Sequence, residues 1–153
     1  MKTGIIIQAR TGSNRLPNKI LLPFFEGKGI LELLIEGLLK IYNKDQVIIA
    51  TSINKNDYKI VEVAENYNVL CFRGNENDVL NRFTEAAKKY KLDKIVRVCS
   101  DNPFLDFKTL KILTEQFNSF NGDYISFCDS KRRPTISLHY GLWAEAVSLS
   151  ALN

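Results

Sequence analysis

Short apolar runs recur along the chain and predict buried strands. They cover Ile5–Ala9, Val47–Ala50, Val69–Phe72, Ile95–Cys99 and Tyr124–Phe127. The runs are rich in isoleucine and valine, which is typical of strands that are covered on both faces. The pattern therefore predicts a sheet that lies between layers of other elements.

Between the apolar runs, hydrophobic residues repeat at the spacing of amphipathic helices. The predicted faces are Leu31, Leu34, Leu38 and Tyr42, then Val79, Phe83, Ala86 and Tyr90, then Leu110, Leu113, Phe117 and Phe120. Asn77 or Asp78 is placed to cap the helix that begins near Val79, and Asp106 the next one. Strands that alternate with helices indicate βαβ units with right-handed crossovers. We therefore predict an α/β fold, a Rossmann-like three-layer sandwich with a mostly parallel sheet.

Such a sheet binds its ligands beyond the carboxyl ends of its strands, near the point where the strand order reverses. We predict the order 3-2-1-4 for the first four strands. The loop after the first strand would then lie beside the loop that ends the segment "KIVRVCSDNPFLD". These two loops are the first place to look for a site.

Composition narrows the class of protein. The chain has 153 residues, of which 45% are hydrophobic and 25% charged, and this suits one domain with one core. The net charge is +4, but basic and acidic residues alternate along most of the chain. A local anionic site fits this balance better than a face that binds nucleic acid.

Other classes are excluded by what the sequence lacks. Three cysteines (Cys71, Cys99 and Cys128) form no CxxC pair, and we expect them to be reduced thiols. His139 is the only histidine, which argues against a zinc site. No apolar run is long enough for a membrane span. We expect a soluble, cytoplasmic protein that binds neither membranes nor nucleic acids.

The first predicted strand runs into a loop rich in cations, in the stretch "IIIQARTGSNRLPNKIL". The guanidinium groups of Arg10 and Arg15, the Lys19 ammonium and the Ser13 hydroxyl are all suited to phosphate oxygens. Gly12 allows backbone torsions that are closed to other residues and lets amides approach a ligand. Neither GxxxxGK[ST] nor GxGxxG is present. A solvated loop whose arginines pair with surface carboxylates is the alternative.

Asp101 directly follows the predicted strand Ile95–Cys99 and should lie at the same edge of the sheet. Mg²⁺ is commonly held by one or two carboxylates together with the phosphate oxygens of a substrate. The alternative is a turn or helix-capping aspartate before Asn102-Pro103. The residues alone leave both readings open.

Four stretches, in order and in register, resemble the cytidylyltransferase family that activates acidic sugars. They are "IIQARTGSNRLPNKIL", "IIATSINKND", "FRGNENDVLNRFTEAAK" and "VRVCSDNPFLD". This family includes the acylneuraminate and CMP-Kdo synthetases, and the SpsF-type branch is the nearest match. The resemblance runs from Gly4 to about Asp106 and continues more weakly to the last residue. It implies the nucleotide-diphospho-sugar transferase type of fold.

The resemblance also implies roles for particular residues. Those implied in catalysis are Arg10, Arg15, Lys19 and Asp101. Those implied in nucleotide binding are Gln8, Ala9, Arg10, Gly12, Ser13, Arg15, Lys19, Thr51, Ser52, Arg73, Asp78 and Arg82. Mg²⁺ is the implied cofactor, with Asp101 and Glu145 as its ligands. Thr51 and Ser52 are equally placed to cap the helix that follows. Asp78 and Arg82, four residues apart, are equally suited to a surface ion pair.

The end of the chain departs from the family pattern. Where the SpsF-like pattern reads "GLDVEVFSFEAL", this chain has "GLWAEAVSLSAL". Glu145 matches the glutamate, but Trp143 replaces the aspartate and weakens a two-carboxylate metal site. The alternative for Glu145 is a salt-bridged strand residue. Because relatives continue beyond the position of Asn153, we expect one nucleotidyltransferase domain over residues 1–153 that lacks the family's C-terminal part.

The resemblance predicts a nucleotidyltransferase that moves CMP from CTP to an acidic sugar and releases pyrophosphate, for surface polysaccharide or glycoconjugate biosynthesis. A homodimer is a further expectation from the resemblance. Two alternatives stay open, because fold does not fix function. One is a sugar-phosphate nucleotidyltransferase or glycosyltransferase of the same fold, and the other is a nucleotide-binding module without catalysis.

Overall fold

The computed structural model describes residues 1–13, 15–138 and 142–152, so His139 lies outside the described residues. In this part of the chain the strands are Thr3–Gln8 (β1), Val47–Ser52 (β2), Leu70–Gly74 (β3), Lys94–Cys99 (β4), Tyr124–Ser126 (β5) and Glu145–Ser148 (β6). The α-helices are Ile30–Leu39 (α1), Tyr58–Tyr67 (α2), Phe107–Ser119 (α4) and, between β3 and β4, Val79–Lys89 (α3). Short 3-10 helices cover Lys44–Gln46 (η1), Lys55–Asp57 (η2), Thr135–Leu138 (η3) and Ser150–Leu152 (η4).

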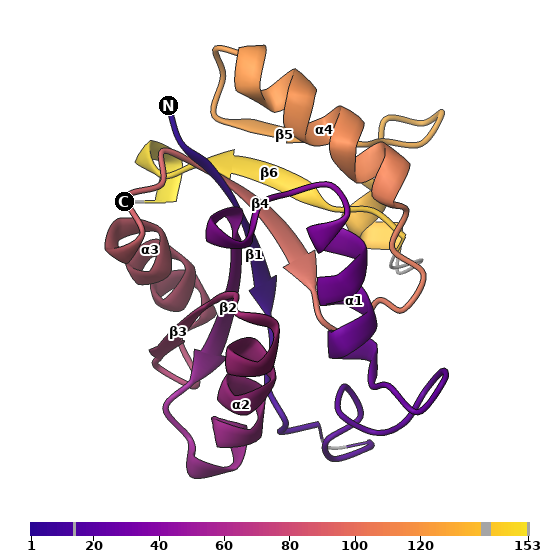
Figure 1. Cartoon of the computed structure of the whole chain (residues 1–153). Helices are drawn as coiled ribbons and strands as arrows, with labels where there is room; N and C mark the ends of the chain where they lie inside the picture. The colour runs from indigo at the N-terminus through magenta and orange to yellow at the C-terminus, as the bar shows by residue number, and fades with distance from the viewer. Residues whose placement is uncertain (14, 139–141, 153) are drawn as a thin grey trace.

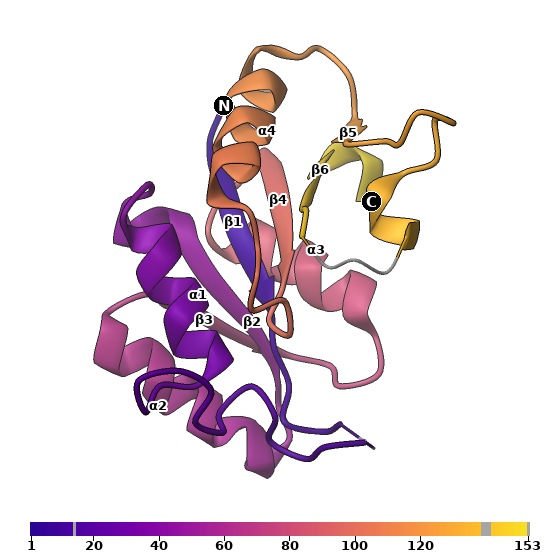
Figure 2. The same ribbon diagram turned by 90° about the vertical axis from the view of Figure 1, so that its right-hand side faces the viewer.

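The strands form one sheet in the order β3-β2-β1-β4-β6-β5. The first four strands are parallel, and β6 runs antiparallel to both β4 and β5 at one end of the sheet (Figure 2). The predicted order 3-2-1-4 is therefore confirmed. The strand order reverses at β1, whose neighbours are β2 and β4, and this is the point at which such sheets bind ligands.

Helices cover both faces of the sheet, so the three-layer expectation is confirmed. Ile5 and Ile7 of β1 point into the larger core, where α1, α2 and α4 pack, and Ile6 points into the smaller core beneath α3. This alternation follows from the two-residue period of a strand. Figure 1 shows α1 and α3 on opposite sides of the sheet.

The predicted helix caps are also confirmed. The Asp78 carboxylate accepts a hydrogen bond from the Asn81 amide at 2.9 Å, and the Asp106 carboxylate accepts one from the Lys108 amide at 2.9 Å. α2 was not singled out from the sequence, although Ile60, Val63, Ala64 and Tyr67 share one face of this helix and lie in or against the larger core. No helix in the described residues is long and apolar enough to cross a membrane.

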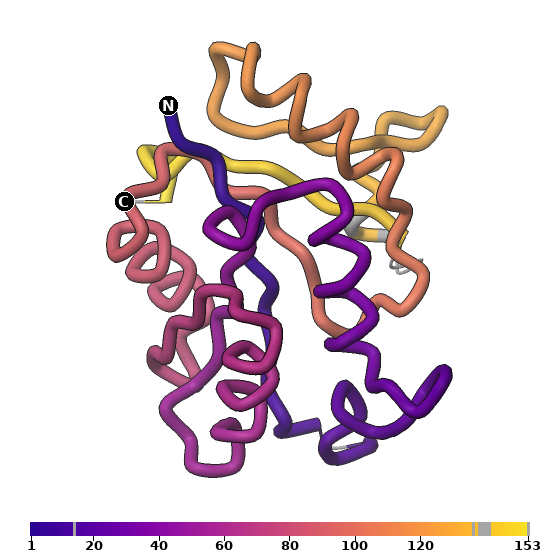
Figure 3. The backbone as a smooth tube through the Cα atoms, viewed as in Figure 1, coloured from indigo at the N-terminus to yellow at the C-terminus, as the bar shows by residue number. Residues whose placement is uncertain are grey.

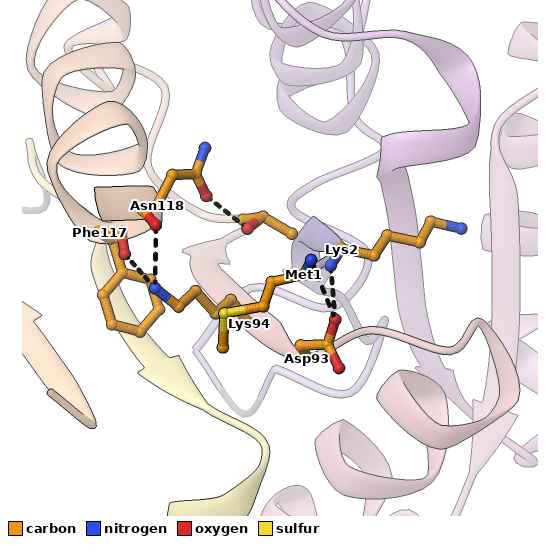
Figure 4. A network of polar contacts seen from close by, with 7 residues as sticks. Met1, Lys2, Asp93, Lys94, Phe117 and Asn118 are labelled. Atoms are coloured by element: carbon orange, nitrogen blue, oxygen red, sulfur yellow. Dashed lines mark hydrogen bonds and ion pairs between the residues drawn. The ribbon is translucent and has the colours of Figure 1, made fainter. Parts of the chain in front are cut away.

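Polar contacts tie the start of β4 to the end of α4 and to the N-terminus (Figure 4). The buried Lys94 ammonium donates hydrogen bonds to the carbonyls of Phe117 and Asn118, which end the helix and carry its partial negative charge. The Lys2 amide donates to the Asp93 carboxylate at 2.6 Å. These contacts fix β1 and β4 relative to each other at the edge opposite to the predicted ligand site.

Candidate functional site

A cavity of about 590 Å³ lies beside the loop that follows β1. From the end of β1 the chain runs outward in a loop and returns to α1 (Figure 3). The residues that line the cavity are Gln8, Arg10, Gly12, Ser13, Arg15, Lys19, Ile20, Glu76, Arg97, Cys99, Ser100 and Asp101. Seven of the residues implied in nucleotide, metal or catalytic roles thus come together here: Gln8, Arg10, Gly12, Ser13, Arg15, Lys19 and Asp101.

The cavity is strongly cationic for its size. Its lining includes three arginines and one lysine, set against the carboxylates of Glu76 and Asp101. Because a concave site with low-dielectric walls concentrates the field of its charges, this excess favours an anionic ligand. The solvated-loop alternative fits less well, because the cations gather around one cavity and are not spread over the surface.

The loops after β1 and β4 meet at one ion pair. The Lys19 ammonium lies 2.6 Å from the Asp101 carboxylate, although the two residues are 82 positions apart in sequence. Their side chains are 31% and 46% exposed, so the pair contributes little to stability. It instead holds a cation and the proposed metal-binding carboxylate at the same cavity wall.

The backbone of the loop is ordered from Thr11. Its carbonyl accepts hydrogen bonds from the amides of Ser13 at 2.9 Å and Asn18 at 3.0 Å. Near these contacts Asn18 adopts a left-handed conformation, with a φ of 58°, whereas Gly12 does not. The expectation of unusual torsions at Gly12 is therefore wrong, and asparagine tolerates that region better than most residues do.

Gly12 leaves open space beside the cavity. A Cβ built on Gly12 meets no protein atom within 4 Å, and the residue lines the cavity. We expect Gly12→Ala to leave the melting temperature within about 2 °C of the original and to weaken CTP binding about 3- to 10-fold, since the methyl group enters ligand space. Calorimetric titration with CTP measures this. Equal affinity in both proteins would show that no ligand atom approaches Gly12.

Several residues implied in nucleotide binding lie behind the cavity and do not line it. Ala9 is 1% exposed, and its amide donates to the Ala50 carbonyl at 3.2 Å. Thr51 and Ser52 are fully buried, and Ser52 uses its hydroxyl inside the protein, as a donor to Asp57. Arg73 donates to the Ser52 carbonyl at 3.1 Å. Ala9, Ser52 and Arg73 thus make their hydrogen bonds within the protein and not with groups that line the cavity.

The alternative of a surface ion pair between Asp78 and Arg82 is wrong, and neither residue lines the cavity. Asp78 caps α3, and Arg82 is completely buried, with Nη1 donating to the Asn75 carbonyl at 2.6 Å. Burial lowers the pKa of Arg82, and the positive charge of Arg10 lowers it further. Four-residue spacing correctly placed both residues near one end of α3, but it could not show that the guanidinium is buried against the carbonyls that follow β3.

Arg97 and Asp57 are among the residues of the site region that were not singled out from the sequence. Arg97 lines the cavity from β4, and Asp57 is a buried aspartate whose carboxylate accepts hydrogen bonds from Thr11. Both lie inside stretches that resemble the family, "VRVCSDNPFLD" and "IIATSINKND". Resemblance was the available signal, because neither charge is part of a local cluster in the sequence.

Asp101 fits a Mg²⁺ ion better than Glu145 does. One Asp101 oxygen meets Lys19, and the half-exposed carboxylate faces the cavity where phosphate oxygens would complete the ligand set. Glu145 is engaged elsewhere, since its two oxygens accept hydrogen bonds from Arg97 at 2.6 Å and from the Tyr124 hydroxyl at 2.8 Å. Among the described residues, no three acidic, cysteine or histidine side chains form a metal-binding group.

Cys99 is the cavity's one thiol among the described lining residues. Burial raises the pKa of this thiol, so at neutral pH it is protonated and weakly nucleophilic. The site therefore suits chemistry that proceeds without a covalent intermediate on the protein.

Fold and cavity together define an α/β protein whose cationic cleft, at the reversal of strand order, suits a phosphate-bearing ligand. The sequence pattern of cytidylyltransferases matches residues 4–136. The chain therefore belongs to the cytidylyltransferase family, as the resemblance of its four stretches predicted.

Three relatives and one solved structure show how far the similarity reaches. The chain is 42% identical to the uncharacterized protein MJ1063 of Methanocaldococcus jannaschii over 99% of its own length and 59% of that protein. It is 34% identical to the spore coat polysaccharide biosynthesis protein SpsF of Bacillus subtilis, over 78% of this chain and 51% of that protein. It is 30% identical to a 3-deoxy-manno-octulosonate cytidylyltransferase of Chlorobium chlorochromatii, over 79% of this chain and 48% of that protein.

The solved structure is a cytidylyltransferase from Leptospira borgpetersenii, which superposes with a TM-score of 0.82 at 35% identity. The match covers 99% of this chain and 62% of that one. In each of these comparisons the chain spans about half to three fifths of the relative's length.

Proposed function

We propose that this chain carries the nucleotide-binding and catalytic part of a Mg²⁺-dependent enzyme that transfers CMP from CTP to an acidic sugar. The observation that carries the proposal is the cationic cavity at the carboxyl ends of β1 and β4. Family membership supports CTP as the nucleotide. The choice of an acidic sugar is supported by the Chlorobium relative, which is named for an octulosonate, a sugar carboxylate.

In the proposed reaction a hydroxyl oxygen of the sugar attacks the α-phosphorus of CTP. The new P–O bond forms as the bond from the α-phosphorus to the bridging oxygen of the β-phosphate breaks. Pyrophosphate leaves with that electron pair, and the hydroxyl proton goes to solvent. No protein nucleophile takes part, which agrees with the protonated thiol of Cys99.

The residues of the loop serve this reaction through charge and position. Arg10, Arg15 and Lys19 line the cavity and would neutralise the phosphate oxygens of CTP and of the departing pyrophosphate. Fixed charges of this kind are the main source of stabilisation where negative charge develops in a transition state. Holding both reactants in line supplies much of the rest.

Asp101 is the residue that would hold Mg²⁺ in this proposal. When bound, the ion would neutralise phosphate charge and orient the triphosphate. Glu145 would have to release Arg97 or Tyr124 to take part, so the assignment of a metal ligand to this chain rests on Asp101.

Release of pyrophosphate tests the proposal. The chain is mixed with CTP, Mg²⁺ and a panel of ulosonic acids. The 1-phosphates of sugars that have no carboxylate are the comparison set. We expect pyrophosphate with at least one acidic sugar and none with the sugar 1-phosphates. Release with a sugar 1-phosphate would favour the alternative of a sugar-phosphate nucleotidyltransferase. CTP binding without release for any acceptor would favour a binding module.

A further inference from the structure

Asp57 is a buried carboxylate that the proposed reaction does not use directly. It lies at the junction of η2 and α2, is 2% exposed and does not line the cavity. A buried charge is costly unless hydrogen bonds satisfy it. The hydrogen-bond partners of Asp57 therefore indicate which part of the protein its carboxylate holds in place.

Hydrogen bonds to this carboxylate come from Thr11, in the loop after β1, and from Ser52, at the end of β2. Oδ1 accepts from the Thr11 amide at 2.7 Å and from the Thr11 hydroxyl at 2.6 Å. Oδ2 accepts from the Ser52 hydroxyl. Burial raises the pKa of Asp57, but the hydrogen bonds from Ser52 and Thr11 lower it by more, so the net pKa lies below its ordinary value and the group is ionised at neutral pH.

Thr11 is the point from which the cationic loop is ordered. Its amide and hydroxyl both bind Asp57, while its carbonyl accepts from the amides of Ser13 and Asn18. The loop between these amides carries Arg15, and Gly12 and Lys19 flank its two ends. The contact between Thr11 and Asp57, which are 46 positions apart, thus fixes the backbone of the loop that carries Arg15 and leads to Lys19.

The charge of Asp57 acts against anion binding, because a carboxylate near a triphosphate repels it. The structure nevertheless places it directly beneath the cationic loop. Position and charge therefore have opposite effects on CTP affinity, and a substitution can tell which of them dominates.

We propose that Asp57 is a positioning residue for the triphosphate, which acts through Thr11 by holding the cationic loop in its binding conformation. This rests on the proposed function in so far as CTP is the ligand. A loop that is ordered only part of the time binds with an affinity reduced by the ordered fraction. Asp57 keeps that fraction high.

The test compares Thr11→Val, Thr11→Ser and Asp57→Asn with the original chain, by titration with CTP and with inorganic tripolyphosphate. We expect Thr11→Val to weaken binding of both roughly 3- to 10-fold, and Thr11→Ser to restore it, since serine keeps the hydroxyl. Asp57→Asn should also weaken binding, although it removes a negative charge. Hydrogen exchange at the amides of Ser13 and Asn18, which bind the Thr11 carbonyl, should be faster in Thr11→Val.

Thr114→Val is the matched control. Thr114 is 6% exposed and Thr11 is 5% exposed, and the Thr114 hydroxyl is hydrogen-bonded to the Leu110 carbonyl at 2.9 Å in α4. It should lower the melting temperature about as much as Thr11→Val does and leave ligand affinity unchanged.

Unchanged or tighter binding in both Thr11→Val and Asp57→Asn would overturn the positioning role. An equal loss of affinity in Thr114→Val would overturn it too, because general destabilisation would then explain the effect. If the original chain binds tripolyphosphate but not CTP, the proposed function fails, and the tripolyphosphate series still decides the role of Asp57. Binding of neither ligand would overturn both proposals.

Discussion

Lys19→Ala is expected to weaken CTP binding roughly 10- to 100-fold, because it removes a charged donor to phosphate from the cavity. The fold should tolerate the change. The Lys19 side chain is 31% exposed and its ion pair with Asp101 is half-solvated, so the free energy of unfolding should fall by less than about 1 kcal/mol. Calorimetric titration gives the affinity, and urea unfolding gives the stability.

Lys28→Ala is the control for this substitution. Lys28 forms an ion pair of the same length, 2.6 Å, with Glu36, and its side chain is 40% exposed, but it does not line the cavity. CTP affinity should stay unchanged in this variant. If Lys19→Ala binds CTP as tightly as Lys28→Ala does, the cationic loop is not the phosphate site.

Asp101→Asn is expected to abolish the effect of Mg²⁺ on CTP binding. Without the metal, affinity should stay equal or rise, since a negative charge leaves the cavity and Lys19 is released. With the metal, the enhancement seen in the original chain should fall at least about tenfold, because even residues that only support a metal ligand are worth about 10- to 100-fold in metal affinity. Titrations with and without Mg²⁺ give both values.

Asp106→Asn is the matched control for Asp101→Asn. Asp106 is five residues further along and caps α4, and asparagine caps helices about as well as aspartate does. Mg²⁺ should enhance CTP binding normally in this variant. Full enhancement in Asp101→Asn as well would move the metal site away from β4.

The fold could be predicted largely from the sequence, because its elements carry strong periodic patterns. The apolar runs at β1, β2, β3, β4 and β5 gave the strands, and the order 3-2-1-4 placed the loop after β1 beside the turn after β4. The meeting of Lys19 and Asp101 followed from that order. α2 carries such a pattern too, at Ile60, Val63, Ala64 and Tyr67, but it was not singled out from the sequence.

The site could be predicted where its residues are close in sequence, and not where burial decides their roles. Arg10, Ser13, Arg15 and Lys19 form one visible cluster, and all line the cavity. Ser52 and Arg82 matched family positions, but that both are completely buried became apparent only from the structure. The partnership of Asp57 with Thr11 and that of Glu145 with Arg97 join distant segments, and local patterns do not encode such contacts.

The most direct test of the central claim is calorimetric titration of the purified chain with CTP, UTP, GTP and ATP in the presence of Mg²⁺, repeated on Arg15→Ala. The account predicts binding that is tightest for CTP and at least about tenfold weaker in the Arg15→Ala chain. Absence of binding for all four nucleotides, or CTP binding that is unchanged in Arg15→Ala, would contradict it.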